Sequence, residues 1–148
     1  MSYVICTVPV SPMRLLPSHV AEMVSQLLFG ETCRVLETSS GGFLKLQCIH
    51  DGYVGYCSES QFIAIDWLSD ETRLSTDWIS EISFKGALMK IPFGSIISNL
   101  KDVGFEGRSI NIERQPKNAE TLKQAIQMFI NTPYLWGGRS VFGTDHIG

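Results

Sequence analysis

The stretch from Phe43 to Cys57 reads FLKLQCIHDGYVGYC and decides the type of fold. Its first half alternates, with Leu44, Leu46 and Cys48 on one side and mostly polar residues on the other, as in a strand with one buried face. Asp51-Gly52 is then the strongest short hairpin signal in the chain, because hairpin turns need residues that tolerate positive φ. The stretch therefore predicts a β-hairpin.

Further strands are predicted on the N-terminal side of this hairpin. Residues 3–10 are rich in β-branched and aromatic residues, whereas three prolines make 11–18 a predicted loop. Residues 22–28 fit a short helix or a strand, and the Phe29-Gly30-Glu31 turn that follows favours the strand; residues 33–37 alternate. About five short strands with glycine-bearing turns thus occupy residues 1–62, the pattern of a small closed barrel.

The next part of the chain predicts a second, smaller barrel. Residues 65–77 are more polar and read as a connector, and apolar runs follow at 78–84 and 86–97. Pro92-Phe93-Gly94 repeats Leu28-Phe29-Gly30 at an offset of 64 positions (94 − 30), which indicates a duplicated unit. Residues 103–113 predict a closing hairpin.

An amphipathic helix is predicted from Asn118 to Asn131. Asn118 can cap it, and Glu120 lies in the first turn, where the helix dipole favours negative charge. One face carries five apolar residues: Leu122, Ala125, Ile126, Phe129 and Ile130. An uncovered stripe of this size predicts docking on the barrels or a homo-oligomer formed through this helix.

Composition excludes several classes of protein. The chain has 148 residues, 44% hydrophobic and 18% charged, which indicates a globular protein. A net charge of −3 without a Lys/Arg cluster gives no reason to expect nucleic acid, and no apolar run is long enough to span a membrane. The N-terminus lacks the features of a signal peptide, so we expect a cytoplasmic protein as written, or a periplasmic or extracellular one if a leader was removed.

The four cysteines, Cys6, Cys33, Cys48 and Cys57, form no CxxC pair, so no zinc site is expected. Each lies among apolar residues, which favours buried, reduced thiols over the alternative of disulfides. His19 and His50 are isolated and read as surface or turn residues rather than metal ligands. We expect neither a metal nor another cofactor.

Two stretches resemble one protein family. Residues 29–56 contain Phe-Gly-Glu, Val-Leu-Glu, Gly-Phe-Leu-Lys-Leu and Asp-Gly-Tyr-Val-Gly-Tyr in order, which resembles a bacterial SH3 (SH3b) domain. The likeness is to the first SH3b domain of NlpC/P60 cysteine peptidases that cleave γ-D-glutamyl–diamino acid bonds. Residues 131–148, NTPYLWGGRSVFGTDHIG, resemble the peptidase motif of the same family, an aromatic residue, Trp-Gly-Gly and a later Asp-Cys-Ser-Gly.

The resemblance implies a mainly β fold with two small SH3-like barrels, residues 1–64 and 65–115. Residues 116–148 then form a C-terminal helix that begins an incomplete α+β papain-like domain. His146 stands where the family has its nucleophilic cysteine, and Ile147 replaces the serine. With the rest of the catalytic domain absent from the sequence given, we expect a relative of murein-peptide endopeptidases that is inactive on its own.

The alternative is an SH3b module that binds cell-wall peptides or a protein partner. In either case the resemblance implies a ligand of the L-Ala-γ-D-Glu-diamino acid type. In the family, the aspartate and serine of the motif hold the free amino terminus of such a peptide, and an aromatic and an acidic group of the first SH3b domain complete the pocket. A carboxylate suits an ammonium group through charge-assisted hydrogen bonds. Packing within the barrel is the alternative role for the two barrel tyrosines. The predicted substrate-binding residues are Asp145, Tyr134, Trp136, Tyr53, Tyr56 and Glu59.

Overall fold

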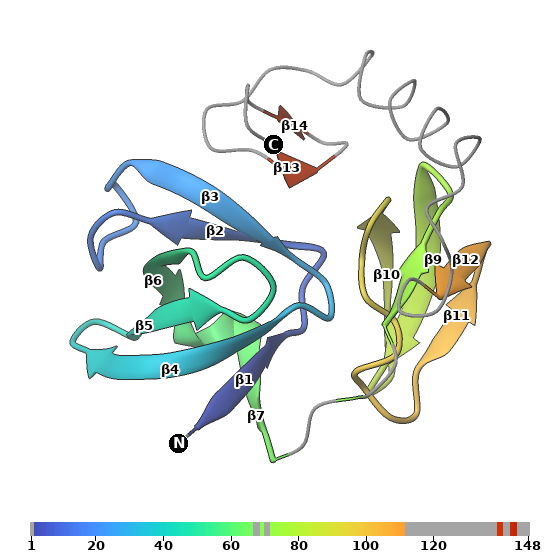
Figure 1. The fold of residues 1–148 in the computed structure, drawn as a ribbon, viewed down its shortest axis with the longest axis horizontal. Helices are drawn as coiled ribbons and strands as arrows, with labels where there is room; N and C mark the ends of the chain where they lie inside the picture. Colours follow the sequence, from blue (N-terminus) through green and yellow to red (C-terminus); the bar gives the residue numbers. More distant parts are fainter. Residues whose placement is uncertain (1, 67–68, 70–71, 112–138, 141–142, 145–148) are drawn as a thin grey trace.

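The computed structural model describes residues 2–66, 69, 72–111, 139–140 and 143–144 (Figure 1). Their structure is mainly β, consistent with the predicted SH3-like fold, and includes one 3-10 turn, η1 (Glu59–Gln61). The predicted fold class was wrong in including a C-terminal helix, because the described part of the chain contains no α-helix. The residues assigned to that helix, 118–131, lie outside the described residues, as does most of the predicted peptidase fragment.

The first unit is an antiparallel seven-stranded sheet with the order β3-β2-β6-β5-β4-β1-β7 (Figure 1). Consecutive strands pair as hairpins at β2–β3, β4–β5 and β5–β6, while β1 lies between β4 and β7 and so joins the start of the unit to its end. The strands are β1 (Tyr3–Cys6), β2 (Val10–Arg14), β3 (Met23–Leu28), β4 (Thr32–Ser39), β5 (Phe43–Cys48), β6 (Val54–Ser58) and β7 (Phe62–Ile65).

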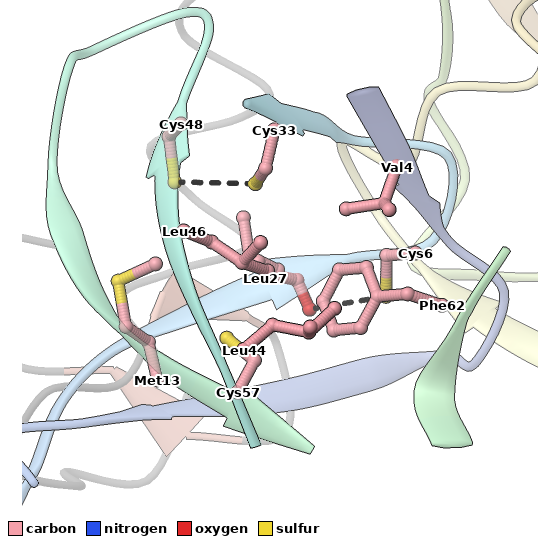
Figure 2. Close-up of a cluster of buried hydrophobic side chains, with 10 residues drawn as sticks. All are labelled: Val4, Cys6, Met13, Leu27, Cys33, Leu44, Leu46, Cys48, Cys57 and Phe62. Carbon is pink, nitrogen blue, oxygen red and sulfur yellow. Dashed lines mark hydrogen bonds between the residues drawn. The ribbon is translucent and has the colours of Figure 1, made fainter. Parts of the chain in front are cut away.

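The predicted central hairpin is confirmed. β5 and β6 pair with Leu44 opposite Cys57 and Lys45 opposite Tyr56, and Gly52 in the connecting turn has φ +73°. The predicted alternation also holds, because Leu44 and its neighbours on that face pack into the barrel core (Figure 2). The buried core residues are Val4, Cys6, Met13, Leu27, Cys33, Leu44, Leu46, Cys48, Cys57 and Phe62.

Two local predictions were wrong, and one ambiguity is resolved. Residues 11–18 were expected to form a loop, but β2 extends through Pro12 to Arg14. Proline is tolerated there because β2 pairs with β6 only at Arg14, so the missing N–H of Pro12 removes no bond from that ladder. The expected connector at 65–77 contains a short strand, β8 (Arg73–Ser75). Residues 22–28 are a strand, as favoured, rather than a helix.

The second unit consists of shorter sheets. β9 (Ile79–Phe84) lies between β10 (Ala87–Pro92) and β11 (Gly104–Glu106), and β8 pairs with β12 (Ser109–Asn111). A further hairpin of β13 (Arg139–Ser140) and β14 (Gly143–Thr144) places β13 beside β3 of the first unit (Figure 1).

The tripeptides Leu28-Phe29-Gly30 and Pro92-Phe93-Gly94 occupy equivalent positions in a structural repeat. Val10 opposes Leu28 across β2–β3, and Ile79 opposes Pro92 across β9–β10. The amide of Gly30 donates to the Cys6 carbonyl at 2.9 Å, and the amide of Gly94 donates to the Ser75 carbonyl at the same distance. β8, β9 and β10 therefore repeat β1, β2 and β3.

The second unit has no counterpart of the β4–β5 hairpin within residues 72–111. Its core of Ile82, Ile91 and Ile97 is correspondingly small, and Phe29 of the first unit completes it. The predicted domain limits at 64 and 115 remain predictions.

The turn after β3 therefore joins the two units. Phe29 is fully buried, the amide of Ile96 donates to its carbonyl at 2.8 Å, and Asn99 Nδ2 donates to the carbonyl of Gly30 at 3.1 Å. Gly30 has φ +82°, and a Cβ atom there would lie 1.7 Å from the carbonyl oxygen of Ile96. Glycine is thus required both by the backbone angle and by the close approach of the second unit.

We predict that Gly30→Ala strongly destabilises the protein. Gly86→Ala is the matched control, because Gly86 has nearly the same φ, +79°, but open space around its Cβ position. The left-handed backbone alone costs about 1–2 kcal/mol in both variants. The clash should add about 1–3 kcal/mol for Gly30→Ala, measured as the free energy of unfolding in urea. If the two variants lost equal free energy of unfolding, the close approach of Ile96 to Gly30 would be contradicted.

Candidate functional site

A transverse row of polar side chains crosses the outer face of the first barrel. Arg14 of β2 opposes Tyr56 of β6, Tyr56 opposes Lys45 of β5, and Lys45 opposes Glu37 of β4. Because the neighbours of Lys45 and Tyr56 along their strands point into the core, these two residues point outward. We call Arg14, Tyr56, Lys45 and Glu37 the polar row.

The row is held together by short-range contacts. The Tyr56 hydroxyl donates to Glu37 Oε1 at 3.3 Å, and Lys45 Nζ lies 5.9 Å from the centroid of the Tyr56 ring. Glu37 is exposed, while the other three residues are half-buried. The Tyr56 ring is therefore presented at the surface between the cationic groups of Arg14 and Lys45, and its hydroxyl donates to the exposed carboxylate of Glu37. This arrangement suits a ligand with charges of both signs.

A β-bulge places Glu37 in the row. Val35 opposes Leu46, but the register then shifts, so that Glu37 rather than Leu36 opposes Lys45. Leu36 is left as the extra residue of the bulged strand and is 43% exposed. The bulge thus brings a carboxylate, instead of an apolar side chain, beside the lysine.

The loop between β2 and β3 borders the row. Arg14 Nη1 donates to the carbonyl of Ala21 at 3.1 Å. The centroid of the His19 ring lies 4.8 Å from the centroid of the Phe43 ring. Phe43 points to the outer face, yet it is buried. The loop carries three exposed apolar residues, Leu15, Leu16 and Val20, beside the row.

The three binding residues predicted in the first barrel lie at three different places. Tyr56 belongs to the row, and Glu59 opens η1 directly after β6, where its amide donates to the carbonyl of Gly42 at 2.8 Å. Tyr53 lies at the hairpin turn, with its amide bound to Asp51 Oδ1 at 3.0 Å. Three residues of extended chain span about 10 Å, so Tyr53 is not brought into the row.

The other predicted site residues belong to the C-terminal motif. Tyr134, Trp136, Asp145 and His146 lie outside the described residues. Conversely, Glu37, Lys45 and Arg14 were not predicted as site residues. The outward side of the Phe43–Ile49 alternation pointed to Lys45, but the partners across β4 and β2 depend on pairings between distant parts of the chain.

The cysteines are unsuited to act as nucleophiles. All four are buried in the barrel core (Figure 2). Burial raises the pKa of Cys57 to about 12 and raises that of Cys6 as well, while a hydrogen bond with Cys48 and burial raise the pKa of Cys33. The thiolate is the reactive form, so Cys6, Cys33 and Cys57 are inert near neutral pH, and Cys48 is shielded by its burial.

The described residues offer neither a metal-ligand cluster nor a membrane-spanning helix. Within the described ranges, no three His, Cys, Asp or Glu side chains are grouped so that they could hold a metal ion. The same part of the chain contains no helix with the length and apolar character needed to cross a membrane.

Comparison with known families connects the first unit to bacterial peptidases. Residues 13–62 match the model of the bacterial dipeptidyl-peptidase SH3 domain. This range runs from β2 to the first residue of β7 and includes Arg14, Tyr56, Lys45, Glu37 and Glu59. No curated protein matches the chain. The predicted SH3b likeness is thus confirmed at the level of a peptidase-associated SH3 domain, and the link to NlpC/P60 enzymes stays a prediction.

We predict that the native protein, with its cysteines fully reduced, resists alkylation. At pH 8, iodoacetamide should label essentially none of the four thiols, because all four are buried and out of reach of the reagent in the folded protein. In urea, all four should react, as counted by intact mass. Rapid labelling of any one cysteine in the native protein would reveal an activated thiol and contradict this assignment.

Proposed function

We propose that the first barrel is a binding module for bacterial cell-wall peptides and that the polar row is its contact surface. The observation that carries the proposal is the Tyr56 ring on the outer face, which lies between Arg14 and Lys45 and whose hydroxyl donates to Glu37. The similarity of residues 13–62 to SH3 domains of bacterial dipeptidyl-peptidases supports it.

The chemistry of the ligand fits this surface. A peptide of the L-Ala-γ-D-Glu-diamino acid type carries ammonium and carboxylate groups close together. Glu37 and Glu59 are exposed carboxylates suited to an ammonium group, and Lys45 and Arg14 suit a carboxylate. The Tyr56 ring offers an apolar surface to the aliphatic parts of the peptide.

The chain is proposed to bind the peptide without cleaving it. The family's nucleophile position is occupied by His146, and the cysteines of the barrel are buried. The protein is then a catalytically silent relative of NlpC/P60 endopeptidases. In this proposal the motif residues Asp145, Tyr134 and Trp136 contribute the other part of the binding site.

The proposal is tested by titrating the protein with L-Ala-γ-D-Glu-meso-diaminopimelate in a calorimeter. Wild type should bind, and Tyr56→Ala and Glu37→Gln should each weaken the affinity roughly tenfold, about 1.4 kcal/mol, through loss of the ring or of the charge. Tyr53→Ala is the matched control and should bind like wild type. Absence of binding, or equal loss in the Tyr53 variant, would contradict the assigned surface.

Chromatography of the same mixtures tests the catalytic part of the proposal. The peptide should remain intact after prolonged incubation with wild-type protein. Release of a diamino acid product that stops when thiols are alkylated would show an active cysteine and overturn the claim of silence.

A further inference from the structure

Two of the four buried thiols lie in direct contact. Cys33 of β4 and Cys48 of β5 are cross-strand partners, and their Sγ atoms are 3.9 Å apart (Figure 2). Both side chains belong to the buried core of the barrel and lie above Leu46 in the view of Figure 2.

The backbone between them has the spacing that a disulfide needs. The amide of Ile49 donates to the carbonyl of Thr32 at 3.1 Å. This bond identifies Cys33 and Cys48 as a non-hydrogen-bonded pair, in which the Cα atoms are about 4.5 Å apart. Disulfides span Cα separations of about 4.4–6.8 Å, and an S–S bond of about 2.05 Å requires each sulfur to move roughly 1 Å from its present position.

The remaining cysteines lack such a partner. Cys6 opposes Phe62, and its thiol donates to the carbonyl of Val8 at 3.4 Å. Cys57 opposes Leu44. Among the four thiols, cross-strand register therefore selects one pair.

We propose that Cys33 and Cys48 are a redox-sensitive pair that closes to a disulfide and fastens β4 to β5. The oxidant is a small-molecule disulfide such as oxidised glutathione. One cysteine thiolate attacks it, forming a mixed disulfide and releasing one thiol; the second cysteine then displaces the other thiol. Two protein thiols are oxidised, and one small disulfide is reduced to two thiols.

The location of the pair determines when this reaction occurs. Both side chains are buried, 0% and 2% exposed, and the pKa of Cys33 is raised in the folded protein. Exchange therefore requires β4 and β5 to separate, and it is fast during folding and slow in the native state. The bond would restrain the 33–48 loop in the unfolded chain and so raise the melting temperature.

The test uses the full chain, unfolded under reducing conditions and refolded with oxidised and reduced glutathione. The expected product has lost two hydrogen atoms, and digestion should yield one peptide pair linked through Cys33 and Cys48. Its melting temperature should exceed that of the reduced protein by about 5–10 °C, and dithiothreitol should abolish the difference.

Variants distinguish this pair from the other thiols. Cys33→Ala and Cys48→Ala should lose the redox dependence of the melting temperature, while Cys6→Ala and Cys57→Ala retain it. The peptide pair found in the digest of the wild-type protein tests the proposal even if a variant of a core cysteine fails to fold. Four free thiols after oxidative refolding, a stable glutathione adduct, or a bond between other cysteines would each overturn the proposal. This inference is independent of the proposed peptide binding.

Discussion

The structure depends on the insertion of one turn of the first barrel into the core of the second unit. The second unit repeats β1 to β3 but has no counterpart of the β4–β5 hairpin within residues 72–111, so its own strands enclose a small core. The side chain of Phe29, which belongs to the first barrel, completes that core. A fully buried phenylalanine contributes several kcal/mol, of the order of the net stability of a small domain. Because Gly30 allows Ile96 and Asn99 to approach the turn, apolar burial and backbone hydrogen bonding act at the same place.

The first barrel separates its core from its polar surface by strand alternation. Residues that point inward form an apolar core containing all four thiols, and residues that point outward form the polar row. The bulge at Leu36 and the loop between β2 and β3 shape the outer face without disturbing the core. A charged, aromatic surface is thereby fixed on paired strands, where the backbone has little conformational freedom left to lose.

Local signals in the sequence predicted the local structure well. Alternation around Leu44 and the Asp51-Gly52 turn sufficed for the β5–β6 hairpin, and the tripeptide echo pointed to the repeat. Pro12 misled the prediction, since its tolerance depends on which neighbouring strand pairs with it. The row was only partly predictable: Tyr56 was named, but Glu37 joins it through a register shift that depends on contacts between strands. Likewise, nothing in the spacing of Cys33 and Cys48 showed that they would face each other.

Hydrogen exchange on Phe29→Ala tests most directly whether the first barrel supplies part of the second core. Amides of β9 and β10, such as those of Ile82 and Ile91, should lose protection in this variant by a larger factor than amides of β5. Unchanged protection of β9 and β10 would contradict the account, because it would show that the second unit is stable without the inserted side chain.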